Sequence, residues 1–264
     1  MSASAASPGA MLTLSVDYSE DELDALADLF GVPALGSPRL RRPPASGTAE
    51  AVLRATLATA TRGLVARRAM MLTGTAIRPK VELLEPHATL LRTFLGAETI
   101  VTVERVTPTE TDRWVVFVRG DVVVEQRAMS GRAILRMTAH PVAALDALVV
   151  ERVDLDAADP APGAARLELS VRSLDAAPGD LPQTAAPAVR ELLYARRQEV
   201  RVVVARRDGE KIERRSLEWL EAGSLGLWRI ERDDAGATAT AEPVTQDDAR
   251  AELEDAYRAR TAAG

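Results

Sequence analysis

A hairpin pattern in the middle of the chain constrains the fold more than any other feature. Two runs of alternating and β-branched residues, 114–118 and 122–126, flank Arg119-Gly120-Asp121. Glycine and aspartate readily take the backbone angles of a tight turn, so this pattern predicts a β-hairpin. A third strand is expected over 133–138, and Pro141 then opens a short helix. Because tight turns join antiparallel neighbours, the stretch predicts an antiparallel sheet.

The same order of elements recurs near the C-terminus, although the residues themselves do not repeat. Strand runs are expected over 200–206 and 211–217, with the turn Asp208-Gly209 between them. A third strand is expected over 225–231, and Pro243 precedes a helix over 246–259. Two copies of one order predict two similar halves. The predicted fold class is therefore α+β, with antiparallel sheets and helices arranged as two pseudo-symmetric halves.

Composition suggests where these halves are divided. Residues 1–10 lack the basic and apolar regions of a secretory signal, so they are expected to form a disordered tail. Residues 156–165 are rich in proline, glycine and alanine, which is typical of a linker. The predicted N-terminal half is 11–155, and the predicted C-terminal half is 166–264.

Periodicity and capping signals predict further elements. Ser19 followed by Glu22 is a capping-box pattern, which predicts the start of a helix over 20–29. More helices are expected over 48–70, 79–95 and 182–197, and more strands over 11–16, 98–106, 149–155 and 166–171. Within the helix over 48–70, the small residues Ala51, Ala55 and Ala58 are interpreted as core. The alternative is that they allow a partner helix to approach closely.

Composition and charge exclude several classes of function. The net charge of −6 argues against a general nucleic-acid binder, and an aromatic content of 3% leaves few rings to stack on bases. The absence of cysteine excludes disulfides, thiolate catalysis and cysteine-based metal sites. No apolar run is long enough to insert into a membrane. The expected partners therefore include neither nucleic acid nor the membrane interior.

The residue types of catalytic and metal sites are few and scattered. His87 and His140 are the only histidines, and each adjoins a proline at an expected helix start. Their spacing matches no zinc motif, and no phosphate-binding loop is present. The pairs Asp233-Asp234 and Asp247-Asp248 are interpreted as parts of a turn and of the first turn of a helix. We therefore predict no catalytic residue, metal or cofactor. A cavity lined by a histidine and a carboxylate would instead indicate an enzyme.

Arginines concentrate between 195 and 215. At alternating strand positions, Arg201 would lie on the opposite side of the strand from Val202. We interpret this run as a solvated strand face whose charges discourage edge-to-edge pairing. The alternative is a patch that binds an acidic partner.

Several short segments together match the layout of a known family. An early leucine-rich helix, with Leu23, Leu26 and Leu29, leads into a proline-containing loop. The later segments are Thr48-Ala49-Glu50, Arg62-Gly63-Leu64, Leu217-Glu218-Trp219-Leu220 and Leu227-Trp228, followed by Pro243 and a closing helix. Across nearly its whole length the chain resembles the EspG family, the cytosolic chaperones of type VII (ESX) secretion in actinobacteria. One departure is that mycobacterial members often have a longer connection between the halves.

The resemblance implies a binding protein without enzymatic activity. An EspG-like chaperone would keep a helical secretion substrate, PE/PPE-like or WXG100-like, soluble in the cytoplasm. In the family a loop of the sheet and the C-terminal helical region contact the substrate. Mapped onto this chain, these contacts implicate Arg119, Gly120, Asp121, Asp208, Gly209, Arg190, Tyr194 and Arg197. The alternative is a homodimeric interaction or scaffold protein without a secretion role.

Overall fold

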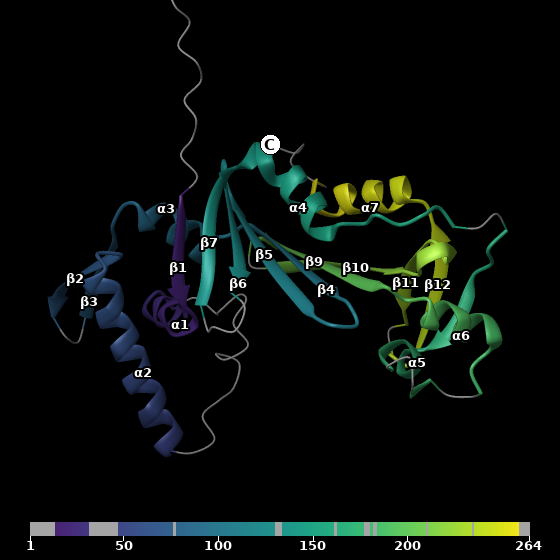
Figure 1. The fold of residues 1–264 in the computed structure, drawn as a ribbon. Helices are drawn as coiled ribbons and strands as arrows, with labels where there is room; N and C mark the ends of the chain where they lie inside the picture. Colours follow the sequence, from purple (N-terminus) through teal and green to yellow (C-terminus); the bar gives the residue numbers. More distant parts are fainter. Residues whose placement is uncertain are drawn as a thin grey trace, which may run out of the picture. The chain divides into compact units, whose positions relative to one another are not determined.

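Packing divides the chain into two units (Figure 1). The structure is a computed structural model that describes residues 14–31, 47–75, 78–129, 134–160, 163–176, 180–181, 184–209, 211–233 and 235–258. Unit 1 is Met1–Glu98 with Val115–Leu145, and unit 2 is Thr99–Trp114 with Asp146–Gly264. The predicted tail lies outside the described residues. The predicted linker and halves remain predictions, since they divide the chain by order along the sequence and not by packing.

Unit 1 contains an antiparallel sheet with the strand order β1-β7-β6-β5 and a separate pair, β2-β3. Its elements are β1 (Ser15–Ser19), α1 (Glu20–Leu29), α2 (Gly47–Ala66), β2 (Met70–Thr75), β3 (Arg78–Leu83), α3 (His87–Leu95), β5 (Thr111–Arg119, from Val115 onward), β6 (Val122–Ala128), β7 (Ile134–Pro141) and η1 (Val142–Ala144). Tyr18 in β1 pairs with Leu135 in β7, which sets the register of the sheet edge beside α1.

Unit 2 contains an antiparallel sheet with the strand order β4-β9-β10-β11-β12-β8. Its elements are β4 (Thr99–Val106), α4 (Leu145–Val153, from Asp146 onward), β8 (Leu167–Ser170), α5 (Val171–Asp175), α6 (Pro187–Tyr194), β9 (Gln198–Asp208), β10 (Lys211–Glu221), η3 (Gly223–Leu225), β11 (Leu227–Arg232), β12 (Thr238–Val244) and α7 (Gln246–Arg258). The long pairing of β4 with β9, from Thr99↔Arg206 to Val106↔Glu199, places β4 in this unit.

The order of elements along the chain repeats, which confirms the predicted pseudo-symmetric α+β fold. Each half has a strand and a serine-capped helix (β1–α1 and β8–α5), a further helix (α3 and α6), four consecutive strands and a final helix. Because β4 and β9 open the two sets of strands, the hairpin β5–β6 corresponds to β10–β11. The sequence pattern alone instead pairs the hairpin β5–β6 with β9–β10. The first half also has an insertion, α2-β2-β3, between α1 and α3, whereas only residues 176–186 connect α5 to α6.

Some elements differ from those expected. The helix expected over 79–95 is the strand β3 followed by α3, because the alternating residues before Pro86 pair with β2. The strand expected over 149–155 belongs mostly to α4, whose buried Leu148, Val149 and Val153 share one helical face. The helix expected over 48–70 ends at Ala66, and the one expected over 182–197 is confined to α6.

Each unit has a core of its own. In unit 1 the rings of Phe94 and Phe117 meet edge to face, with centroids 5.1 Å apart. In unit 2 the buried Trp228 donates from Nε1 to the carbonyl oxygen of Leu225 at 3.0 Å. It belongs to a cluster with Leu169, Leu174, Leu181, Val189, Leu192, Leu193, Leu220 and Ile230. Among the described residues, no helix has the length and hydropathy that a membrane crossing requires.

Candidate functional site

The predicted hairpin turn of unit 1 is present and is fixed against the end of a helix. Arg119 is the last residue of β5, and its Nη1 donates to the carbonyl oxygen of Arg92 at 2.8 Å. This carbonyl lies in the last turn of α3, where a cation interacts favourably with the helix dipole. Gly120 has a φ of 55°, which favours glycine, and a Cβ there would meet no atom within 4 Å. Gly120 and Asp121 are therefore exposed at the tip of a well-defined turn.

The predicted residues of unit 2 lie at opposite ends of one hairpin. β9 and β10 pair along their full 11-residue lengths. At about 3.3 Å per residue, such a strand is roughly 36 Å long. Asp208 and Gly209 are at the turn, where Gly209 has a φ of 61°, whereas Arg197 directly precedes the start of β9. The structure does not bring these two predicted groups together.

The helix α6 has one buried and one exposed side. Its buried residues are Val189, Leu192 and Leu193, which belong to the core cluster of unit 2. Tyr194, at its C-terminal end, is 60% exposed. The Nε of Arg190 is buried and has no hydrogen-bond partner. Arg197 lies against Gly223, where an added Cβ would stand 2.9 Å from its Nε. Of the predicted residues Arg190, Tyr194 and Arg197, Tyr194 is the aromatic one, and it is exposed.

Arg201 of β9 and Arg232 of β11 form ion pairs with carboxylates of the same unit. Arg201 Nη2 lies 2.5 Å from Glu199 Oε1 and 3.5 Å from Asp175 Oδ1. Arg232 donates from Nε and Nη2 to the two oxygens of Glu218, at 2.9 and 2.8 Å. Burial raises the pKa of the Glu199 carboxyl, although the Arg201 cation opposes this shift. Arg201 and Arg232 are therefore held in an ion-pair network, whereas Arg207, Arg214 and Arg215 are exposed, as the sequence predicted for a solvated strand face.

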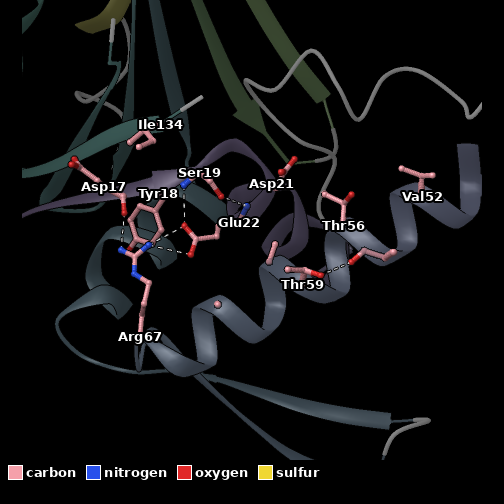
Figure 2. A pocket seen from close by; sticks show the side chains of 13 residues that line it. Asp17, Tyr18, Ser19, Asp21, Glu22, Val52, Thr56, Thr59, Arg67 and Ile134 are labelled. Carbon is pink, nitrogen blue, oxygen red and sulfur yellow. Dashed lines mark hydrogen bonds and ion pairs between the residues drawn. The ribbon is translucent and has the colours of Figure 1, made fainter. Parts of the chain in front are cut away.

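A second network in unit 1 joins β1 and α1 to Arg67, which directly follows α2, and to His87 of α3. Figure 2 shows its members Asp17, Tyr18, Glu22 and Arg67. Arg67 Nη1 donates to both oxygens of Glu22, at 3.1 and 2.9 Å, and Nη2 donates to the carbonyl oxygen of Asp17 at 2.7 Å. The same guanidinium lies 5.4 Å from the ring centroid of Tyr18. The Tyr18 hydroxyl is 2.7 Å from His87 Nδ1. Burial lowers the pKa of His87, and the nearby Arg67 cation lowers it further. Nδ1 of the neutral imidazole can then accept a hydrogen bond from the hydroxyl group of Tyr18.

A groove of about 860 Å³ adjoins this network. Figure 2 shows one wall formed by α2 and another by the β1–α1 junction. The lining residues are Asp17, Tyr18, Ser19, Asp21, Glu22, Val52, Ala55, Thr56, Thr59, Ala60, Gly63, Arg67 and Ile134. Sequence reasoning missed the groove because it assigned Ala51, Ala55 and Ala58 to the core. That assignment is wrong, since all three residues are exposed.

Among the described residues, neither the groove nor a second cavity combines a histidine with a carboxylate. A smaller cavity of about 300 Å³ in unit 2 is lined by α4, its C-terminal extension and α7. Neither this cavity nor the groove is lined by a histidine. His140 Nε2 does lie 3.9 Å from Glu125 Oε2, outside both cavities. Within the part of the chain that the structure describes, no group of three or more histidines and carboxylates could hold a metal ion.

Comparison with solved structures identifies the fold. The type VII secretion system chaperone EspG5 of Mycobacterium tuberculosis, solved in complex with the PE25–PPE41 dimer, matches 92% of this chain and 95% of its own. The TM-score is 0.51 and the sequence identity is 16%. No family model and no curated protein matches the chain. The chain therefore has an EspG-like fold, which confirms at the level of the fold the resemblance predicted from its layout.

Proposed function

We propose that the protein is a chaperone-like component of type VII (ESX) secretion that keeps a helical secretion substrate soluble in the cytoplasm. The observation that carries this proposal is the EspG-like fold, which extends over 92% of the chain. The matched protein is a chaperone, and its structure contains a bound PE–PPE dimer. A helical substrate of the PE/PPE or WXG100 kind is therefore the partner that we propose here.

The proposed contact residues are those at the two hairpin turns and on α6. Holding a substrate soluble requires accessible surface for its apolar segments and no chemistry. Tyr194 supports this role because an exposed aromatic ring contributes a large contact area and a polar hydroxyl. Gly120, Asp121 and Gly209 are exposed at their turns, which makes them accessible to a substrate. The turn at Gly120 belongs to unit 1, whereas the turn at Gly209 and α6 belong to unit 2, so we propose contact residues in each unit.

The test is to isolate the tagged protein from its host and to quantify by mass spectrometry what remains bound. We expect one small helical type VII substrate in an amount close to that of the protein. Tyr194→Ala should lower the retained substrate about tenfold or more if the ring is an anchor of the interface. Phe30→Ala is the matched control because Phe30 is also an exposed aromatic, at 39%, and lies outside the proposed surface.

Other outcomes would redirect the assignment. Recovery of the protein alone, with the mass of a dimer by light scattering, would replace the chaperone by a homodimeric scaffold. An equal loss of substrate in Tyr194→Ala and Phe30→Ala would leave a chaperone but remove α6 from its contact surface.

A further inference from the structure

We propose that the groove between α1 and α2 binds an amphipathic helix of a partner protein. The apolar side chains of this helix would lie against α2, and its basic side chains would lie along α1. The proposal concerns a surface separate from the hairpin turns and α6, and it does not depend on the secretion role.

The insertion that distinguishes the first half exposes apolar side chains. Val52, Leu53 and Val65 of α2 are 62%, 37% and 40% exposed. Together with Met71 and Leu72 of β2, they are more than half of the exposed large apolar side chains among the described residues. A helix that only supported the fold would bury such residues, as α6 buries Leu192 and Leu193 to 1%. Of these five side chains Val52 lines the groove, and its high exposure indicates a surface that a partner covers.

The shape of the groove suits a helix. Six residues of α2 line it at helical spacing along one face, and Arg67, which directly follows α2 and whose N–H bonds to Gly63, continues the row: Val52, Ala55, Thr56, Thr59, Ala60, Gly63 and Arg67. At 1.5 Å per residue, this face is about 22 Å long, the length of a helix of roughly 15 residues. Its central positions are small, so another helix could pack closely against α2. Recognition of a helix in a groove commonly uses such a row of spaced apolar contacts.

The charges of the groove favour a basic flank on the bound helix. α1 carries Glu20, Asp21, Glu22, Asp24 and Asp28 and no lysine or arginine. Asp17 and two of these carboxylates, those of Asp21 and Glu22, line the groove. Arg67 is the lining cation, and its guanidinium is bonded to Glu22 and to the backbone of β1. Asp17 is in turn bonded to Arg136, which does not line the groove. Three carboxylates still line the groove against one cation, so lysine or arginine side chains would be favoured there over anionic ones.

Binding of designed peptides tests the proposal directly. The first peptide has about 18 residues, with a leucine stripe at helical spacing, lysine along one flank and glutamine along the other. The second peptide replaces every lysine by glutamate. We expect the full-length protein to bind the lysine peptide at least tenfold more tightly, as measured by fluorescence anisotropy. Equal binding of both peptides, or binding of neither, would overturn the proposal.

Two matched arginine variants locate the binding site. Ala55 and Ala58 are both exposed on α2, but only Ala55 lines the groove. Ala55→Arg places a long cation in the groove, so we expect affinity for the lysine peptide to fall at least tenfold. Ala58→Arg adds the same charge outside the groove and should change affinity less than about twofold. Unchanged thermal unfolding in both variants shows that the fold is retained, and an equal loss of affinity in both contradicts the proposed site.

A second variant tests the acidic wall, and a mass measurement tests the occupant. Asp21→Asn removes one lining charge and should weaken binding of the lysine peptide about threefold without weakening binding of the glutamate peptide. Light scattering then compares the wild type with Ala55→Arg. A wild-type dimer that Ala55→Arg, but not Ala58→Arg, dissociates would assign the groove to a second copy of this chain and would overturn the partner-helix proposal.

Discussion

The junctions β1–α1 and β8–α5 begin alike and end in different environments. In unit 1, Ser19 Oγ accepts from the backbone N of Glu22 at 3.1 Å, and Glu22 Oε2 accepts from the backbone N of Ser19 at 2.9 Å. In unit 2, Ser170 Oγ accepts from the backbone N of Ser173 at 3.1 Å. Both serines thus begin a helix directly after a sheet strand by satisfying its first free N–H groups.

The segment after each capped helix determines the difference. After α5, a short connection leads to α6, whose Leu192 and Leu193 enter the core of unit 2. After α1, the insertion adds α2, which contacts α1 but leaves an open groove beside it. The same local signal therefore produces a closed core in one unit and an accessible surface in the other. The capping serines therefore set where α1 and α5 begin, whereas the segment that follows each helix determines whether an open groove remains beside it.

Truncating one apolar side chain on each of α6 and α2 should produce the largest contrast. Leu192→Ala removes a side chain that is only 1% exposed, so it should lower the free energy of unfolding by about 2–5 kcal/mol. Val52→Ala removes a side chain that is 62% exposed and should cost less than about 0.5 kcal/mol. Urea denaturation measures both effects. A comparable cost for Val52→Ala would mean that this face of α2 is packed, and the contrast between the units would fail.

Replacing the arginine of each network should produce an intermediate effect. Arg232→Lys breaks the two-pronged contact with Glu218, and Arg67→Lys breaks the corresponding contact with Glu22. The side chain of Arg232 is 26% exposed and that of Arg67 is 40% exposed. We expect losses of about 1–2 kcal/mol for Arg232→Lys and about 1 kcal/mol for Arg67→Lys in urea denaturation. A larger loss for Arg67→Lys would reverse the ranking and show that the groove side depends more on its ion pair.

The features that the sequence predicted correctly depend on residues that are close together along the chain. The turn at Gly120 and the capping box of Ser19 each involve groups within three residues of one another. Their signals therefore appear in the sequence as short patterns. The order of strands and helices followed from these signals, and with it the fold class. The contact surface proposed for the chaperone rests on the resemblance, and the hairpin geometry only shows where its residues lie.

The parts that were missed depend on distant residues. The β-branched Val149, Val150 and Val153 favour a strand locally, yet α4 buries Val149 and Val153 on one helical face. Tyr18 and His87 are 69 positions apart, so no spacing could reveal their contact. For the same reason, an alanine-rich helix gives no signal of whether its small residues face a core or a groove. Only the tertiary arrangement settles such cases.

Acidification should change the free energy of unfolding in opposite directions through His87 of unit 1 and Glu199 of unit 2, and both changes should be small. Both histidines of the chain belong to unit 1, where burial lowers the pKa of His87 below its usual 6.5. The unfolded chain then binds a proton that the folded chain does not, so stability falls as pH drops from about 6.5 through the folded pKa. Tyr18, Arg67 and Glu22 are the charged or titratable groups around this imidazole.

Glu199 of unit 2 should act in the opposite direction. Its folded pKa is raised above 4.5, so the folded state binds the proton first, and stability rises as pH falls through that pKa. The free energy of unfolding is measured by urea denaturation for the wild type, His87→Gln and Glu199→Gln at about pH 7.5, 5.5 and 4.5, which separates the two contributions. Relative to the wild type, His87→Gln should lose less stability on acidification, and Glu199→Gln should lose more. If both variants deviate in the same direction, the two networks do not respond to protons as their burial implies, and the contrast between the units reduces to packing alone.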